Sequence, residues 1–186
     1  MRVVGGRFKG RKLSSFDGDA IRPTTDKVRE AIFNVLGVPF QFKKVLDLFA
    51  GSGALGIEAL SRGAEEALFV DMSRESVKVI EDNLNACKIG KEAKVLKKPV
   101  LSAIAELKED SGFDLVFLDA PYKDIDATKE ALKLLSKTQA LTNDCLLVCE
   151  ISSRETLDED FLKESGLEAL KEKKYGDSAV YFLERK

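Results

Sequence analysis

Short apolar runs alternate with helical patterns along most of the chain. Lys44–Phe49 and Phe113–Leu118 are largely apolar, as strands buried on both faces of a sheet are. Between such runs, apolar residues recur at helical spacing, and Ser73 is placed to cap one helix. The pattern predicts strands at Lys44–Phe49, Ala67–Asp71, Ala93–Leu96, Phe113–Leu118 and Cys145–Glu150. It predicts helices at Ala54–Arg62, Arg74–Cys87 (closed near Gly90), Leu101–Lys108, Ala127–Lys137 and Leu157–Glu164.

The two ends of the chain depart from this alternation. Leu167–Tyr175 and Ala179–Arg185 predict two strands joined by a tight turn, so the last strand should be antiparallel. At the other end, Arg2–Val4 and Arg11–Leu13 predict a small hairpin, and Asp26–Leu36 an amphipathic helix. We expect an α/β fold with a mostly parallel sheet covered on both faces, in which residues 1–40 form a basic extension and 41–186 the α/β domain.

The charge is unevenly distributed between these two parts. Residues 1–46 hold ten Lys and Arg against four acids, which gives +6; because the whole chain carries −2, the remainder carries −8. Such segregation favours a basic segment that contacts a phosphate backbone, although a solvated basic terminus has the same composition. No long apolar run or leader is present, so we expect a cytoplasmic protein.

The chain contains no histidine, which excludes whole classes of chemistry. Ser-His-Asp and Cys-His nucleophiles, histidine metal sites and imidazole catalysis are impossible. Cys87, Cys145 and Cys149 have no metal-site spacing and are expected in the core, so we predict no metal site. The chemistry must use carboxylates, hydroxyls, amides, cations or a bound cofactor.

A glycine turn follows the first predicted strand of the sheet. Gly51, Gly53 and Gly56 have G-x-G-x-x-G spacing, which by itself is a weak signal for a dinucleotide. Asp47, before the turn, suits the ammonium group of S-adenosylmethionine better than a pyrophosphate. Asp71, which ends the next strand, suits the ribose hydroxyls of any adenosine cofactor, and Met72 is placed to pack on the adenine.

The segment Asp119-Ala120-Pro121-Tyr122 distinguishes between these cofactors. It follows the apolar Phe113–Leu118, so a carboxylate, a proline and an aromatic ring are expected at the same sheet edge. Asp119 and a backbone carbonyl would accept hydrogen bonds from the two N–H groups of an exocyclic amine, while Tyr122 stacks on the base. Methyl transfer to an amine is an in-line displacement that needs neither histidine nor a metal.

Several stretches resemble one family, the bacterial 16S rRNA guanine-N2 methyltransferases. They are the opening Arg2–Leu13, the segment Arg22–Asn34, the run Asp47–Ala64 and the late Tyr175–Ala179, while residues 119–122 are similar to the (D/N/S)PP(Y/F) motif of amino-methyltransferases. The resemblance implies a Rossmann-like class I methyltransferase fold with a seven-stranded sheet and an antiparallel last strand. It also implies S-adenosylmethionine as cofactor and 16S rRNA as partner. Separately, we expect the protein to be a monomer.

The resemblance assigns roles to individual residues. It implies that Asp119, Pro121 and Tyr122 hold the base, and that RNA is bound by Arg2, Arg7, Lys9, Arg11, Lys12, Arg22, Thr24 and Arg29. It implies that the cofactor is held by Asp47, Phe49, Ala50, Gly51, Ser52, Gly53, Asp71, Met72, Pro99 and Val100. Two positions depart from the motifs. Ala120 replaces the first motif proline, and Pro99 stands where a polar residue often contacts adenine, so backbone groups of Pro99 or Val100 would serve there.

Three other functions remain compatible with parts of the pattern. A DNA adenine-N6 or another RNA amino-methyltransferase would use the same tetrapeptide, but no target-recognition domain is evident. An NAD-dependent oxidoreductase would explain the glycine turn but not residues 119–122. A ribosome-assembly module without turnover would explain the basic segment but not the set of intact acidic positions.

Overall fold

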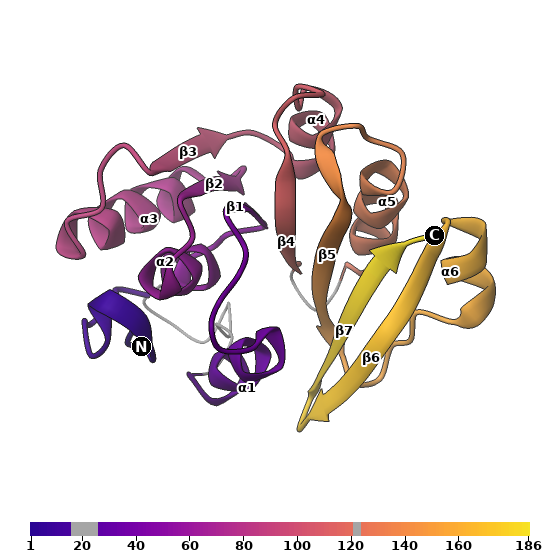
Figure 1. Ribbon diagram of the computed structural model, residues 1–186, viewed down its shortest axis with the longest axis horizontal. Coiled ribbons are helices and arrows are strands. Elements are labelled where there is room, and N and C mark those ends of the chain that lie inside the picture. Colours follow the sequence, from indigo (N-terminus) through magenta and orange to yellow (C-terminus); the bar gives the residue numbers. More distant parts are fainter. Residues whose placement is uncertain (16–25, 121–123) are drawn as a thin grey trace.

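A computed structural model of the chain describes residues 1–15, 26–120 and 124–186 (Figure 1). Its centre is a seven-stranded sheet in the order β3-β2-β1-β4-β5-β7-β6. Adjacent pairs from β3 to β5 are parallel, whereas β7 is antiparallel to both β5 and β6. The strands are β1 (Lys44–Leu48), β2 (Glu66–Asp71), β3 (Ala93–Lys97), β4 (Phe113–Asp119), β5 (Leu141–Ser152), β6 (Leu167–Tyr175) and β7 (Ser178–Arg185).

Helices cover both faces of the sheet, as the nearly continuous apolar strands predict (Figure 1). One face packs against α1 (Asp26–Leu36), α2 (Ala54–Arg62) and α3 (Arg74–Ala86). The other packs against α4 (Val100–Ala105), α5 (Ile125–Leu135) and α6 (Glu159–Glu164).

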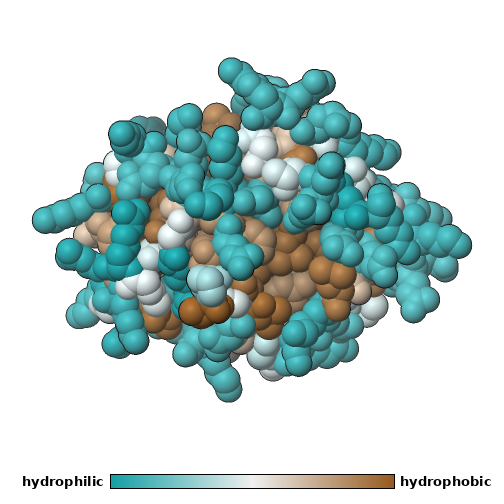
Figure 2. Space-filling model, in the orientation of Figure 1, coloured by the Kyte–Doolittle hydropathy of each residue, from teal (hydrophilic) through white to brown (hydrophobic). Residues whose placement is uncertain are grey.

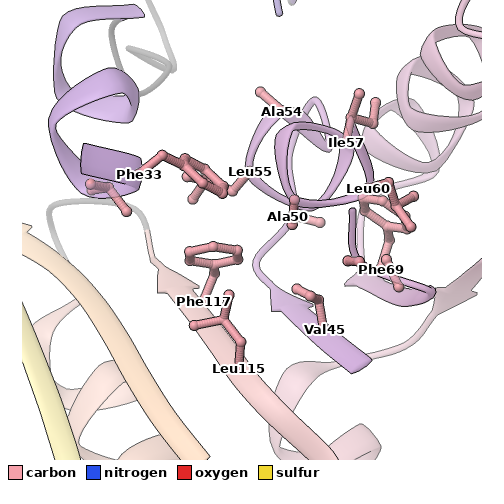
Figure 3. Packing of buried hydrophobic residues seen from close by; sticks show 14 of the residues in the cluster. Phe33, Val45, Ala50, Ala54, Leu55, Ile57, Leu60, Phe69, Leu115 and Phe117 are labelled. Carbon is pink, nitrogen blue, oxygen red and sulfur yellow. The ribbon is translucent and has the colours of Figure 1, made fainter. Parts of the chain in front are cut away.

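The two cores are filled by alternate residues of the same strands. Val45, Phe69 and Phe117 point to the α1–α3 face, whereas Leu46, Val70 and Val116 point to the other. Figure 3 shows Phe33 of α1 lying over Phe117 of β4; their ring centroids are 5.7 Å apart. Helix α1 is therefore part of the core on this face.

The strands and helices predicted from residue 26 onward are all present, and the antiparallel last strand is confirmed, whereas the predicted hairpin near the N-terminus is reduced to a single bridge. Ser73 caps α3 as expected, but that helix ends at Ala86, and the chain turns at Lys88, a non-glycine residue with a φ of 57°, before it reaches Gly90. Helix α4 ends at Ala105, earlier than predicted. Strand β5 begins at Leu141, so the polar stretch Thr142–Asp144 is also in the strand.

The N-terminal residues pack against the rest of the chain. Arg2 and Lys12 form a single antiparallel bridge around a 3-10 turn at Gly6–Phe8. Val3 and Leu13 are buried in the cluster that contains α1, α2 and α3. The division near residue 40 stays a prediction, but residues 1–13 share a core with the α/β domain.

Most of the face seen in Figure 2 is hydrophilic, with apolar residues gathered near its middle and lower edge. Four large apolar side chains are exposed among the described residues: Val38, Met72, Leu134 and Leu170. None of the helices that the structure describes is long and apolar enough to span a bilayer.

Candidate active site

The strand register brings two predicted site residues to one level of the sheet. Val70, Leu48 and Leu118 are aligned on β2, β1 and β4. Asp71 and Asp119 each come one residue later, so both lie at the carboxyl edge of the sheet, and β1 lies between their strands. Neighbouring strands are about 4.8 Å apart, which puts the two Cα atoms about 10 Å from each other. A crevice at this edge is where open α/β sheets bind ligands.

Three acidic residues also share one face of the sheet. Asp47, Asp71 and Asp119 each lie two residues after a side chain of the α1–α3 core, namely Val45, Phe69 and Phe117. Alternation along each strand therefore points the three carboxyl groups to the side of the sheet where α2 begins. The sequence predicted that these residues lie at one edge of the sheet. The alternation of side chains along the strands adds that the three carboxyl groups also point to the same face.

The glycine turn joins β1 to α2 through left-handed backbone. Phe49, Gly51 and Gly53 have φ angles of 56°, 54° and 74°. The Ala50 amide donates to the Val70 carbonyl at 3.0 Å, which fixes the turn against the end of β2. Gly53 is the N-cap of α2 and uses no side chain, so backbone is presented where that helix begins.

Asp71 is held by the turn that it faces. One carboxylate oxygen accepts from the Gly51 amide at 2.9 Å, and the other accepts from the Ser73 amide at 2.8 Å. Each oxygen has a second lone pair, so the carboxylate can also accept two hydroxyl hydrogen bonds. This chemistry fits the ribose of an adenosine cofactor, with the glycine turn beside it.

Asp47 lies beneath the turn and is 1% exposed. Its Oδ2 accepts from the Gly56 amide at 2.8 Å. Burial raises the pKa of Asp47 to about 8, opposed by the Gly56 hydrogen bond and reinforced by the charge of Asp71. A cation placed near Asp47 would favour its ionised form, so the residue fits an ammonium group. Direct contact with that group stays a prediction.

The other predicted cofactor residues lie around the same edge. Met72 is 71% exposed beside Asp71, where it is available to cover a flat ring. Pro99 is the N-cap of α4, and Val100 begins that helix and is buried. The Lys98 amide donates to the Asp71 carbonyl, which holds this segment next to the end of β2.

Asp119 ends β4, and Ala120 directly after it is buried. Pro121 and Tyr122 lie outside the described residues. Asp119 is aligned with Glu150 of β5, a buried residue whose Oε1 accepts from the Ser178 hydroxyl at 2.7 Å. A hollow opens beside Ala120, lined by Ala120, Asp124, Ile125, Thr128, Glu150, Ile151, Ser152 and Glu155. Polar groups therefore continue past Asp119 toward the next strand.

Comparison with known proteins establishes the family. Residues 1–184 match the protein-family model described as "Conserved hypothetical protein 95". The chain is 44% identical over 151 residues to "Putative rRNA methyltransferase YlbH" of Bacillus subtilis (strain 168), covering 81% of this chain and 82% of that protein. It is 37% identical over 150 residues to "Ribosomal RNA small subunit methyltransferase D" of Escherichia coli (strain K12), covering 81% and 74%. A solved structure, "Putative methyltransferase yhhF from Escherichia coli", matches with a TM-score of 0.81 at 33% identity, over 100% of this chain and 98% of that one.

The chain belongs to this family of S-adenosylmethionine-dependent rRNA methyltransferases. The family, the fold class and the cofactor predicted from the sequence are confirmed. The roles of individual site residues remain predictions.

Residues 1–13 of the methyltransferase form its N-terminal turn. Five predicted RNA-binding cations lie on this turn and are exposed: Arg2, Arg7, Lys9, Arg11 and Lys12. Arg7 also forms an exposed ion pair with Glu92 at 3.1 Å. Arg22 and Thr24 fall outside the described residues.

The assignment of Arg29 to the RNA-binding set needs correction. Its side chain is fully buried, where its guanidinium binds Asp26 at 2.7 Å and the Arg2 carbonyl, and lies 3.7 Å from Glu58. A side chain enclosed by protein cannot reach an RNA phosphate. The sequence showed a cation on α1, but its apolar spacing did not reveal that Arg29 faces inward.

Sequence reasoning missed two buried polar residues that attach the N-terminal segment to the methyltransferase core. Glu58 of α2 accepts from the Val4 and Gly5 amides at 2.8 and 2.7 Å and from Arg62 at 2.8 Å. Asn83 of α3 binds Ser14. A polar residue on the buried side of an amphipathic helix was the available signal for both.

Proposed function

We infer that this methyltransferase transfers a methyl group from S-adenosylmethionine to the exocyclic N2 amine of a guanine in small-subunit (16S) rRNA. The observation that carries the proposal is the alignment of Asp71 and Asp119 on either side of the glycine turn, in a chain whose family methylates rRNA. The spacing of about 10 Å leaves room for a ribose at one carboxylate and a base amine at the other.

Each acidic residue has a distinct task in this proposal. S-adenosylmethionine, when bound, supplies an electrophilic methyl group on its sulfonium. Asp71 and the glycine turn bind the ribose side of the cofactor, and Asp47 balances its ammonium charge. Asp119 accepts a hydrogen bond from an N–H of the base amine and so orients the nitrogen toward the methyl group, while Tyr122 stacks on the base.

Binding of RNA is assigned to the exposed cations of the N-terminal turn. Arg2, Arg7, Lys9, Arg11 and Lys12 lie on one short segment that packs on α2, the helix that begins at the glycine turn. Phosphate contacts from this segment would position the RNA without reading its sequence. An rRNA substrate implies a cytoplasmic enzyme, and the monomer expected from the sequence belongs to the same proposal.

The proposal is tested by the modified nucleosides of a strain that lacks the gene. We expect mass spectrometry of 16S rRNA to show less 2-methylguanosine than in the parent, with restoration by the intact gene. Restoration should fail with an Asp119→Ala copy expressed at the same level. Unchanged 2-methylguanosine together with loss of another methylated amine would keep the chemistry and reassign the base.

A further inference from the structure

The side chain of Asn83 links two segments that the proposed function uses separately. Its Nδ2 donates to the Ser52 carbonyl at 2.9 Å and to the Ser14 carbonyl at 3.0 Å. Its Oδ1 accepts from the Ser14 amide at 2.7 Å. Asn83 is 1% exposed, so its amide is shielded from water and makes three hydrogen bonds, all to backbone groups.

Both ends of this link lie at functional segments. Ser52 is inside the glycine turn, between Gly51, whose amide binds Asp71, and Gly53, the N-cap of α2. Ser14 comes directly after the N-terminal turn that carries the exposed cations. The Ser52 hydroxyl also contacts the Met1 sulfur at 3.7 Å, so the turn touches the N-terminal segment at a second point.

The arrangement is stiff, because each partner of Asn83 is a main-chain group. The side-chain amide of Asn83 binds the Ser52 carbonyl and also both backbone groups of Ser14. A shift of the Ser52 carbonyl therefore acts on the same amide that holds Ser14. An unmade hydrogen bond in a buried site is costly, so the three bonds favour moving together. A single buried side chain thereby connects the glycine turn to the N-terminal segment.

We propose that Asn83 is a positioning residue that couples cofactor binding at the glycine turn to RNA binding by the N-terminal segment. This rests on the proposed function, since it assumes that RNA meets the segment that Ser14 follows. Such coupling is reciprocal: the factor by which bound cofactor raises the affinity for RNA equals the factor by which bound RNA raises the affinity for cofactor. A purely structural Asn83 would support the fold and leave that factor unchanged.

The test measures this factor with full-length protein. RNA affinity is determined for a 16S rRNA transcript with and without saturating S-adenosylhomocysteine, for wild type, Asn83→Ala and Asn85→Ala. Asn85 is an exposed neighbour on the same helix and is the matched control. We expect S-adenosylhomocysteine to raise the affinity for RNA about fivefold or more in wild type and Asn85→Ala, which is the usual range of coupling. In Asn83→Ala we expect the affinity for RNA to stay unchanged, a factor of about one. An equal factor in all three proteins, including a factor of one, overturns the proposal.

A second measurement needs neither RNA nor a variant. The Ser14 amide donates to Asn83, so its hydrogen exchange reports the link directly. We expect S-adenosylhomocysteine to slow exchange at Ser14 several-fold in wild type, while the Lys163 amide on α6 stays unchanged. No change at Ser14 with cofactor product bound rejects the coupling. Failure to bind S-adenosylhomocysteine or RNA at all would instead reject the proposed function, so the two failures are distinguishable.

Discussion

The backbone amide of Gly56 donates to Oδ2 of Asp47 at 2.8 Å, and position 56 has no space for a side chain. A Cβ atom there would lie 2.4 Å from the Phe69 ring and 3.0 Å from the same Asp47 oxygen. The first turn of α2 thus rests directly on β1 and β2. This close packing sets the position of the glycine turn, which connects β1 to α2.

Substitution of Gly56 by Ala should destabilise the protein and weaken cofactor binding. The new methyl group must displace Phe69, which is fully buried, so we expect a loss of about 1–3 kcal/mol in the free energy of unfolding. Urea denaturation measures this loss. Gly90→Ala is the control, since its Cβ would meet only a Glu92 oxygen at 3.7 Å, and its effect should stay within about 0.5 kcal/mol. Equal stability of the two variants would contradict the packing argument.

The raised pKa of Asp47 predicts how stability depends on pH. Asp47 binds a proton up to about pH 8 when folded, whereas its ordinary value of 3.8 applies when unfolded. Between these values the folded state holds the extra proton, so the contribution of Asp47 to stability falls as the pH rises and levels off above about 8. Asp47→Asn should lack this fall while its side-chain oxygen still accepts from Gly56. Parallel stability curves for the two proteins, from pH 5 to 8, would rule out the raised pKa.

The same carboxyl group predicts a pH-dependent affinity for the cofactor. If Asp47 faces the ammonium group, binding favours its ionised form and releases a proton at neutral pH. Affinity for S-adenosylhomocysteine should then rise from about pH 6 to 7.5, by up to about tenfold for each pH unit. Calorimetry in buffers of different ionisation enthalpy detects the released proton. In Asp47→Asn the rise should vanish; if it persists, another group is responsible.

Asp119→Ala should separate catalysis from cofactor binding. Asp119 is two strands away from Asp71, so its removal leaves the ribose side intact but frees the base amine to rotate. We expect kcat to fall about 100-fold or more, the usual cost of lost orientation, with little change in affinity for S-adenosylhomocysteine. Asp126→Ala, an exposed acid on α5, is the control. Near-normal turnover by Asp119→Ala on 16S rRNA would remove Asp119 from the mechanism.

Neutralising the N-terminal cations should weaken RNA binding and flatten its dependence on salt. For each RNA phosphate that the protein no longer neutralises, the slope of log affinity against log salt becomes shallower by about 0.7 to 0.9. The variant replaces Arg7, Lys9, Arg11 and Lys12 by Gln, and filter binding at several salt concentrations gives the slope. The control replaces four exposed lysines elsewhere: Lys108, Lys133, Lys137 and Lys163. If both variants change the slope equally, the N-terminal turn is only part of a general positive surface.

The sequence alone determined the elements and the strand ends at which the acidic residues lie. Periodicity records which side of each segment is buried, and this local property placed Asp71 and Asp119 at strand ends. The cofactor class followed because the residues around Asp47 and Asp119 form continuous motifs. The sequence also predicted the β6–β7 hairpin, since Gly176 and Asp177 supply its turn.

Only the tertiary structure decided which distant residues meet. It places β7 between β5 and β6, and it buries Arg29. It also carries β5 through the polar Thr142–Asp144, which lies at an irregularity in the pairing with β4 and is held where Arg185 donates to the Thr142 carbonyl. Glu58 and Asn83 bind backbone groups that lie 31 to 69 positions away in the chain. Hydrogen bonds between remote segments leave no periodic trace in the sequence, because they depend on how the packed elements align in space.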